Sequence, residues 1–157
     1  MKVIFLDFDG VITTLESKWR LDPKKMKLIE RICNKTGAKI VISSSWRRWT
    51  LEDTIKDITD TSRWGVPVPF TPIKKVVGVT SRLYAFKNDD VQHHFGLPRG
   101  VEIERYLSEH TDIDKYVILD DDADMLLEQA PYFIKTDAIE GLSELDAEKA
   151  INILNDI

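Results

Sequence analysis

Three short apolar runs along the chain each lead into side chains that carry oxygen. They cover residues 2–7, 38–43 and 116–119, and the last run is followed by three consecutive aspartates. Continuous aliphatic runs of this length are typical of strands that are buried on both faces, as in a parallel sheet. A weaker run over residues 132–135 has the same form. The pattern therefore predicts four strands of one sheet.

Helical spacing of apolar residues fills the intervals between these strands. Asp22 followed by Pro23 offers an N-cap and a first-turn proline, and Gly37 supplies the matching stop. Thr50 and Ser143 have the same capping character. Helices are predicted over residues 23–36, 51–60, 100–110, 123–129 and from 144 onwards. Strands that alternate with helices predict an α/β fold of three layers, a Rossmann-like, mostly parallel sheet with helices on both faces.

Residues 61–98 do not fit this alternation. Prolines and glycines interrupt them, and only residues 75–80 have an extended pattern. An irregular excursion of this length is often functional in a small domain. Because 157 residues is close to the size of one domain, we expect residues 1–157 to form a single domain that carries this excursion.

Composition narrows the class of protein. Apolar residues make up 43% of the chain and charged residues 31%, which is typical of a globular protein. No apolar run approaches the roughly 20 residues that a membrane helix needs. Asp7 and Asp9 interrupt the N-terminal apolar run too early for a signal peptide. Cys33, the single cysteine, has no internal disulfide partner and fits a reducing interior, so we expect a cytoplasmic protein with no membrane segment.

The net charge of −5 conceals an uneven distribution. Residues 18–87 hold 16 Lys and Arg against 6 Asp and Glu, whereas residues 88–157 hold 5 against 18. This asymmetry could steer an anionic ligand toward one face, or it could reflect two solvated surfaces that differ in charge. The sequence leaves both interpretations open.

The oxygen-bearing side chains that follow the strands point to a shared site. Asp7 and Asp9 follow the first strand, residues 43–45 are three serines after the second, and residues 120–122 are three aspartates after the third. In open α/β sheets, ligands bind beyond the carboxyl ends of the strands. Carboxylates crowded at that edge repel one another unless a cation lies among them, and Mg²⁺ prefers hard oxygen ligands. The sequence therefore predicts a Mg²⁺ site.

The Asp-Phe-Asp-Gly motif at residues 7–10 also has a purely structural interpretation, because carboxylates often cap turns. Its position directly after an apolar strand, with Gly10 allowing a tight turn, favours a functional role. The hydroxyl of Ser43 and the aspartates at 120–122 strengthen that interpretation.

Together these motifs resemble the haloacid dehalogenase-like (HAD) phosphohydrolase superfamily over nearly the whole chain. The resemblance rests on residues 5–11, 40–43 and 117–124, in that order. A narrower branch, the HAD domain found in RNA-repair polyproteins and in small phage or bacterial proteins, is similar at further segments. These segments are residues 43–47, 77–80 and 99–103.

The resemblance implies a phosphatase that works through an aspartyl-phosphate intermediate. Asp7 would be the nucleophile, and Asp9 would protonate the leaving oxygen and then deprotonate the attacking water. Ser43, with Ser44 beside it, would bind the phosphoryl oxygens.

The resemblance also implies the ligands of the metal ion. Mg²⁺ would be held by Asp7, the main-chain carbonyl of Asp9 and the pair Asp120 and Asp121. Which of these two, or Asp124 further along, binds the ion directly stays open. The ion would screen Asp7 from the negative charge of the phosphate that it attacks.

One part departs from the superfamily pattern. The superfamily usually supplies a lysine, sometimes an arginine, ahead of the final acidic motif to stabilise the phosphoryl group. No lysine occurs between Lys87 and Lys115, and Lys115 precedes its strand, at the end away from the site. Arg99 is the first candidate for this role because a guanidinium can bind two phosphate oxygens, and Arg47 is the second.

Superfamily members often carry a cap domain between the first and second motifs or between the third and fourth. Only 33 residues separate Asp9 from Ser43, and only 20 separate Arg99 from Asp120, which leaves room for one helix in each place. We therefore expect no large cap. An open site suits a phosphate at the end of a nucleic acid or another macromolecule.

Two alternatives remain at this stage. One is a phosphatase of a small phosphoester or nucleotide. The other is a non-catalytic module that binds metal and phosphate, against which the presence of both Asp7 and Asp9 argues.

A nucleic-acid substrate carries its own expectation. Five basic residues are then predicted to line a groove leading to Asp7, namely Arg47, Arg48, Lys74, Lys75 and Arg82. The same basic region holds Trp19, Trp46, Trp49 and Trp64. These tryptophans could stack on nucleobases or pack in the core and at its rim.

Overall fold

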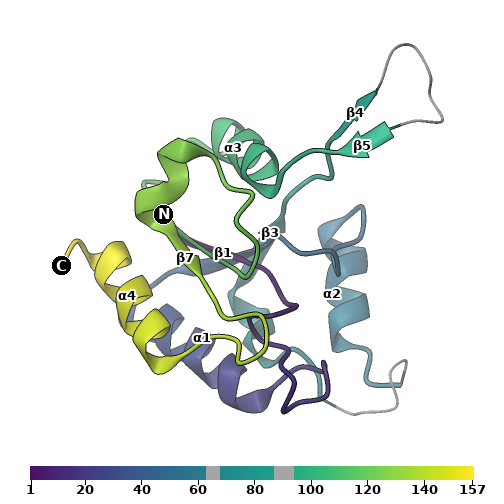
Figure 1. The fold of residues 1–157 in the computed structure, drawn as a ribbon, viewed down its shortest axis with the longest axis vertical. Helices are drawn as coiled ribbons and strands as arrows, with labels where there is room; N and C mark the ends of the chain where they lie inside the picture. The colour runs from purple at the N-terminus through teal and green to yellow at the C-terminus, as the bar shows by residue number, and fades with distance from the viewer. Residues whose placement is uncertain (63–67, 87–93) are drawn as a thin grey trace.

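The computed structural model describes residues 1–62, 68–86 and 94–157, with a five-stranded sheet at its centre (Figure 1). Its strands are β1 (Lys2–Leu6), β2 (Lys39–Ile42), β3 (Val76–Val79), β6 (Lys115–Asp120) and β7 (Phe133–Lys135). They lie in the order β3-β2-β1-β6-β7, and every neighbouring pair is parallel. The four predicted strands are confirmed, and the extended segment in the excursion adds the fifth at one edge.

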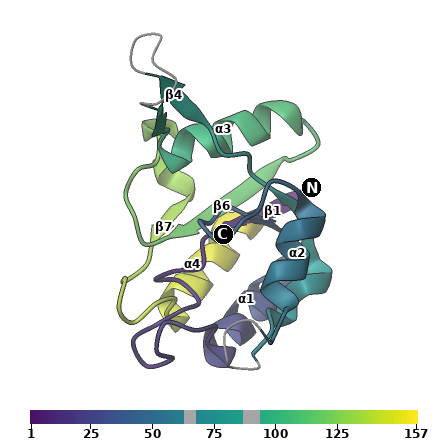
Figure 2. The ribbon, with the colours of Figure 1, turned by 90° about the vertical axis from the view of Figure 1, so that its right-hand side faces the viewer.

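Helices cover both faces of this sheet. Helices α1 (Pro23–Thr36) and α4 (Glu144–Asn155) pack against each other on one face, and α3 (Arg99–Glu109) lies on the other (Figure 2). Helix α2 (Leu51–Thr59) contacts β3 at the edge of the sheet. This arrangement confirms the predicted three-layer, Rossmann-like α/β fold.

The predicted caps account for the helix bounds. The Asp22 carboxylate accepts a hydrogen bond from the Lys24 N–H at 2.9 Å, and Pro23 begins α1 where no N–H is needed. Gly37 ends α1 in the left-handed conformation, with φ of 75°. The hydroxyls of Thr50 and Ser143 accept backbone N–H groups in the first turns of α2 and α4.

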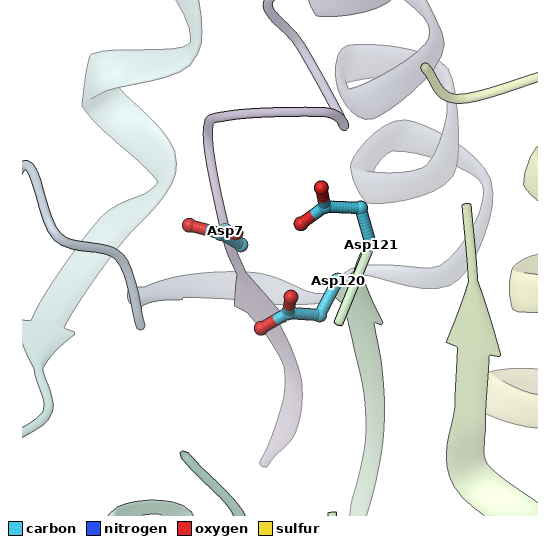
Figure 3. A group of neighbouring side chains, drawn as sticks. All are labelled: Asp7, Asp120 and Asp121. Atoms are coloured by element: carbon cyan, nitrogen blue, oxygen red, sulfur yellow. The ribbon is translucent and has the colours of Figure 1, made fainter. Parts of the chain in front are cut away.

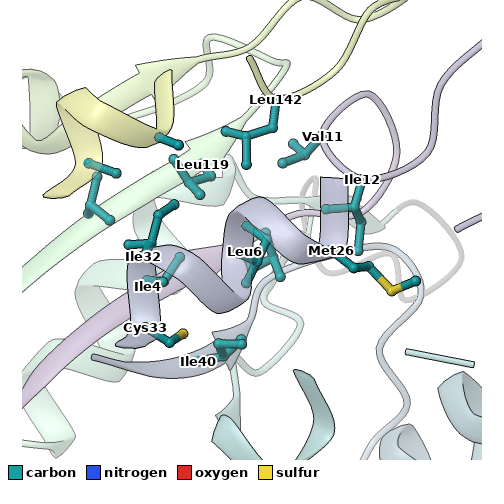
Figure 4. Close-up of a cluster of buried hydrophobic side chains, with 14 of the residues drawn as sticks. Ile4, Leu6, Val11, Ile12, Met26, Ile32, Cys33, Ile40, Leu119 and Leu142 are labelled. Atoms are coloured by element: carbon teal, nitrogen blue, oxygen red, sulfur yellow. The ribbon is translucent and has the colours of Figure 1, made fainter. Parts of the chain in front are cut away.

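Strand β1 is apolar on both faces because both are buried. Ile4 and Leu6 belong to the cluster formed with α1 and α4 (Figure 4), whereas Val3 and Phe5 belong to the cluster formed with α3. All four side chains have an exposed fraction of 0%. Burial on both faces explains why the strand has a continuous apolar run in place of alternation.

The prediction of an α-helix over residues 123–129 is wrong. Residues 123–126 form no helix, and a 3-10 helix, η2, covers Leu127–Tyr132. Contacts with the start of α3 decide the difference. The Asp124 carbonyl accepts the Gly100 N–H at 3.1 Å, and the Gln129 side-chain N–H donates to the Gly100 carbonyl at 2.8 Å. These tertiary hydrogen bonds override the local preference for an α-helix.

The excursion over residues 61–98 is more regular than its sequence indicates. It contains the 3-10 helix η1 (Thr71–Lys75), β3, and an antiparallel hairpin of β4 (Tyr84–Phe86) and β5 (His94–Gly96). The hairpin extends away from the central sheet, beside α3 (Figure 1). Its strands have three residues each, which is too short for a periodic pattern to show.

Among the described residues, only α1 and its loops lie between β1 and β2, and only a loop lies between α3 and β6. The expected absence of a large cap at these two positions agrees with this arrangement. No helix within the described ranges is long and apolar enough to cross a membrane.

Candidate active site

The three central strands bring the predicted site residues to one edge of the sheet. Strand β1 lies between β2 and β6, so Asp7, Ser43 and Asp120 end three neighbouring strands. The backbone ladder continues into them, because the Ser43 N–H donates to the Leu6 carbonyl at 2.9 Å and the Asp7 N–H donates to the Leu119 carbonyl at 3.0 Å. The expected location at the carboxyl ends of the strands agrees with the structure.

Three carboxylates converge at this edge. One oxygen each from Asp7, Asp120 and Asp121 lies within 4.8 Å of the others, and we call these three residues the acidic cluster (Figure 3). Asp7 and Asp120 are buried, with exposed fractions of 6% and 2%. Of the five carboxylates expected at this edge, these three meet; the carboxylates of Asp9 and Asp122 have other partners.

Burial and mutual repulsion shift the protonation of the acidic cluster. Burial raises the pKa of Asp7 to about 6, and the charge of Asp121 adds to this, whereas the Arg99 guanidinium and the Ser44 hydroxyl act in the opposite direction. Burial, and then the charge of Asp7, raise the pKa of Asp120 to about 8. The cluster is therefore poorly suited to hold three negative charges without a cation among them.

Gly10 allows the acidic cluster to form. Its φ is 73°, a conformation that favours glycine, and a Cβ atom there would lie 2.4 Å from Oδ2 of Asp121. The Gly10 carbonyl accepts a hydrogen bond from the Thr136 hydroxyl at 2.6 Å, which fixes the loop from the β7 side. Any side chain at position 10 would displace the Asp121 carboxylate.

The carboxylate of Asp9, two residues after Asp7, is held by two donors. The Trp46 indole N–H donates to its Oδ1 at 3.0 Å, and the Thr13 hydroxyl donates to the same oxygen at 3.2 Å. Within the part of the chain that the structure describes, Oδ2 of Asp9 accepts no hydrogen bond. One oxygen thus fixes the carboxylate, and the other is available for proton transfer.

The two serines after β2 differ in their hydrogen bonding. The Ser44 hydroxyl accepts the Trp46 backbone N–H at 3.2 Å. The Ser43 hydroxyl is buried and has no hydrogen-bond partner among the described residues. A buried hydroxyl without a partner is rare in a native structure and points to a ligand or water that satisfies it.

Arg99 faces the acidic cluster from the start of α3. Its Nε lies 3.8 Å from Oδ2 of Asp120, and its Nη1 is buried without a hydrogen-bond partner in the described ranges. The Asp124 carboxylate accepts the Arg99 backbone N–H at 2.8 Å. Asp124, which the sequence left open as a metal ligand, therefore lies at the helix start and positions Arg99.

Arg47 is used inside the protein. Its Nη2 pairs with the Glu102 carboxylate, and its Nη1 donates to the Ser44 carbonyl at 3.1 Å. Burial lowers the pKa of Arg47 to about 10, and the charge of Glu102 opposes that shift. Only 4% of Arg47 and 5% of Glu102 are exposed. This buried ion pair ties the loop after β2 to α3.

Three contacts at the site were not predicted. The sequence predicts stacking or packing for Trp46 but not its hydrogen bond to Asp9. It predicts neither the pairing of Glu102 with Arg47 nor the contact of Asp124 with the start of α3. For Glu102, the one available signal is its position three residues after Arg99, on the same side of a helix. The contact between Trp46 and Asp9 joins residues 37 positions apart, and local patterns carry no information on such a pair.

The basic groove expected for a nucleic acid is wrong in its composition. Lys74 and Lys75 belong to η1, which directly precedes β3. They therefore lie at the amino ends of the parallel strands, whereas Asp7 lies at the carboxyl ends. Arg48 pairs with Asp57, and Arg82 donates to the carbonyls of Ser45 and Arg47 at 2.8 and 3.0 Å. Trp49 is 80% exposed, and Trp64 lies outside the described residues.

A parallel sheet whose central strands end in an Asp-x-Asp motif, a serine and an aspartate pair is the architecture of the HAD-like class. Within that class, the chain belongs to the family described as the HAD domain in Swiss Army Knife RNA repair proteins, whose model matches residues 3–147. No curated protein and no solved structure matches the chain in the corresponding comparisons. Membership of this family suggests a phosphatase.

Proposed function

We propose that the protein is a Mg²⁺-dependent phosphatase that hydrolyses the terminal phosphate monoester of a polynucleotide through an aspartyl-phosphate intermediate. The observation that carries the proposal is the acidic cluster, in which the oxygens of Asp7, Asp120 and Asp121 lie within 4.8 Å of one another. Asp9 on one side and Arg99 on the other complete the site.

The acidic cluster fits a Mg²⁺ ion. Its donors are carboxylate oxygens, which are the hard ligands that this ion accepts. Burial, and to a smaller extent the neighbouring carboxylates, raise the pKa values of Asp7 and Asp120, so a bound cation would favour their ionised forms. Asp7, Asp120 and Asp121 would hold the ion, together with the main-chain carbonyl of Asp9. When bound, the ion lowers the repulsion between the Asp7 carboxylate and the phosphate.

In the first step, a carboxylate oxygen of Asp7 attacks phosphorus while the bond from phosphorus to the ester oxygen breaks. Asp9 in its protonated form gives its proton to that leaving oxygen, which departs as a hydroxyl group. Oδ1 of Asp9 is fixed by Trp46 and Thr13, so Oδ2 is the oxygen that transfers the proton.

In the second step, a water molecule attacks the phosphorus of the aspartyl phosphate. The Asp9 carboxylate takes one proton from that water, and the bond from phosphorus to Asp7 breaks. Inorganic phosphate leaves, the Asp7 carboxylate is regenerated, and Asp9 is again protonated for the next cycle.

Two buried donors without partners support a phosphoryl site next to Asp7. Within the described ranges, they are the Ser43 hydroxyl and Nη1 of Arg99. Nε of Arg47 is also buried without a partner there, but the other two nitrogens of that guanidinium bind Glu102 and the Ser44 carbonyl. A bound phosphoryl group offers the oxygens that such donors need, and a guanidinium stabilises the charge that develops on them. These observations support Arg99 over Arg47 for the phosphoryl contact that the sequence left open between them.

Three observations favour turnover on a macromolecule over the alternatives. Asp7 and Asp9 are both present, and the Asp9 carboxylate is held by two donors, which a pure binding module would not need. No large cap lies between β1 and β2 or between α3 and β6 among the described residues, so a long substrate can reach the site. The description of the matching family as a domain of RNA repair proteins supports a polynucleotide as the substrate.

The direct test is hydrolysis of an aryl phosphate with and without Mg²⁺, followed by a panel of phosphorylated oligonucleotides, nucleotides, sugars and phosphopeptides. We expect turnover that depends on Mg²⁺ and the highest kcat/KM on an oligonucleotide with a terminal phosphate. No hydrolysis of any member would contradict the proposal. A preference for sugars or free nucleotides would assign the protein to small phosphoesters.

The two arginines are expected to respond differently to substitution by alanine. Arg99→Ala should lower kcat/KM by roughly 100-fold or more, as expected for loss of a donor to the transition state, and should change the melting temperature little. Arg47→Ala should destabilise the protein by about 3–5 kcal/mol, because Glu102 is left buried without its partner. Phosphatase assays and thermal unfolding of both variants provide the measurement. The reverse pattern would assign the phosphoryl contact to Arg47.

A further inference from the structure

A cavity of about 500 Å³ lies beside Trp46, outside the acidic cluster. Its volume falls within the range of pockets that accept small ligands. The lining combines aromatic and aliphatic side chains with three basic and two acidic ones, including Trp19, Trp46, Lys18, Arg20, Arg48, Asp57 and Asp60. Trp46 connects this lining to the candidate active site through its hydrogen bond to Asp9.

Trp46 connects the cavity to the site. Its ring packs on Phe8 with the centroids 5.3 Å apart, and Phe8 stacks on Phe70 at 5.1 Å. Its indole N–H donates to Asp9, two residues after Asp7. The indole is therefore held in place by packing and by a hydrogen bond, and it contacts both the cavity and Asp9.

Trp19 lines the same cavity from a loop with unfavourable backbone conformation. Lys18 and Trp19 have φ of 55° and 60°, a region that residues with a Cβ atom rarely adopt. The loop is held by hydrogen bonds of Ser17, whose hydroxyl donates to the Arg20 carbonyl at 2.6 Å and accepts the Thr14 N–H at 2.9 Å.

This conformation presents a large apolar ring to solvent. The exposed fraction of Trp19 is 49%, although it lines a cavity. Strained backbone that persists at a cavity is typical of a binding site, because the strain is retained where a side chain must point toward a ligand.

The charges around the cavity identify the ligand class. Lys18 and Arg20 are exposed next to Trp19. Both acidic residues of the lining have partners, because Asp57 pairs with Arg48 and Asp60 accepts hydrogen bonds from the N–H and hydroxyl of Ser62. Exposed aromatic rings beside basic side chains are the combination that binds single-stranded nucleic acid, in which rings stack on bases and cations contact phosphates.

We infer that this cavity binds a nucleobase near the end of a single-stranded polynucleotide, with Trp19 as the stacking residue and with Lys18 and Arg20 contacting the following phosphodiesters. This inference rests on the proposed function and names how its substrate is held. The base lies on one side of Trp46 and the terminal phosphate on the other.

The test compares two variants on matched ligands. Trp19→Asn removes the ring and keeps a residue that tolerates positive φ, and Trp49→Asn makes the same change at an exposed tryptophan outside the cavity lining. We expect Trp19→Asn to weaken binding of a fluorescently labelled, phosphorylated oligonucleotide roughly 5- to 100-fold, the range that one stacked base supplies. Trp49→Asn should bind like the unmodified protein.

An oligonucleotide whose terminal and penultimate nucleotides lack bases separates stacking from other effects. On this ligand, the unmodified protein and Trp19→Asn should bind equally weakly, because the interaction that the variant removes is already missing. Equal binding of the normal and abasic oligonucleotides by the unmodified protein would overturn the inference. So would equal losses in the two tryptophan variants.

Turnover of glycerol phosphate, a phosphate monoester that has no ring, keeps the two claims apart. If the protein hydrolyses glycerol phosphate with Mg²⁺ but fails the binding test, the inference is wrong and the proposed phosphatase chemistry stands. If it hydrolyses no phosphoester, the proposed function is wrong. Binding of the fluorescently labelled oligonucleotides still decides whether the cavity binds a nucleobase. Arg20→Gln should reduce the salt dependence of oligonucleotide binding, and an unchanged slope would exclude the phosphodiester contact.

Discussion

Replacement of Asp7 by asparagine is expected to lower kcat for phosphate hydrolysis by roughly three to six orders of magnitude, as loss of a nucleophile does in other enzymes. An amide oxygen does not attack phosphorus to form a stable intermediate, and no other carboxylate of the acidic cluster occupies the end of the central strand β1. Single-turnover and steady-state assays on an aryl phosphate provide the measurement.

The fold of this variant should remain intact. The amide oxygen of asparagine can still accept the Phe8 N–H, which donates to Oδ1 of Asp7 at 2.8 Å. The substitution also removes a negative charge next to Asp120, so the metal-free variant should be at least as stable as the unmodified protein at neutral pH. A lower melting temperature would contradict this reasoning.

Asp122→Asn serves as the matched control for Asp7→Asn. Asp122 lies on the same loop as the acidic cluster, but its side chain is exposed and accepts the Ala123 N–H at 2.8 Å, a bond that asparagine preserves. Its activity should stay within about twofold of the unmodified protein, in line with surface substitutions that keep their contacts. If the activity of Asp7→Asn stays within tenfold of the unmodified protein, the assignment of Asp7 as the nucleophile is wrong.

Saturating Mg²⁺ is expected to raise the melting temperature by about 5–10 °C at neutral pH, and removal of Mg²⁺ by a chelator should abolish hydrolysis. A ligand at 100 times its Kd stabilises the folded state by about 2.7 kcal/mol, and 1 kcal/mol shifts the melting temperature of a chain of this size by about 2–4 °C. Thermal unfolding across a Mg²⁺ titration measures the shift.

The stability of the metal-free protein should fall as the pH rises from about 4 to about 8. The ordinary aspartate pKa is 3.8, whereas Asp7 and Asp120 have values of about 6 and about 8 in the folded state. In this window the folded protein holds more protons than the unfolded chain, so raising the pH favours unfolding. Mg²⁺ binds the ionised carboxylates, so its stabilising effect should grow over the same window.

Two outcomes would contradict this account of the acidic cluster. One is a melting temperature that millimolar Mg²⁺ leaves unchanged at pH 8, where the carboxylates are ionised. The other is stability of the metal-free protein that rises between pH 4 and pH 8. Asp121→Asn should reduce the effect of Mg²⁺ because it removes one of the three converging oxygens.

Sequence patterns were sufficient for most of the fold and for the location of the site. The apolar runs of β1, β2 and β6 mark strands that are buried on both faces, and such strands have one dominant solution, a parallel sheet covered by helices. Because parallel strands end at the same edge, the polar residues after them had to meet. The caps at Asp22 and Ser143 are local interactions and were therefore predictable.

Features that depend on contacts between distant residues were not predictable. Glu102 pairs with Arg47 across 55 positions, and this contact between distant residues is what favours Arg99 over Arg47 in the proposed function. The Asp9 carboxylate is not part of the acidic cluster, because it is bound by Trp46 and Thr13. Lys74 and Lys75 are among the basic residues that make residues 18–87 positively charged. They precede β3, however, so they lie at the amino ends of the strands, away from the site at the carboxyl ends. Net charge along a sequence does not specify a surface.

The central claim is that Asp7 receives the phosphoryl group at a Mg²⁺ site. A crystal structure with Mg²⁺ and beryllium fluoride, which mimics a phosphoryl group bound to a carboxylate, tests it most directly. We predict beryllium fluoride attached to an oxygen of Asp7, contacted by Arg99 and Ser43, with Mg²⁺ among Asp7, Asp120 and Asp121. Beryllium fluoride attached to another carboxylate, or Mg²⁺ bound away from the acidic cluster while Asp7 stays unmodified, would contradict it.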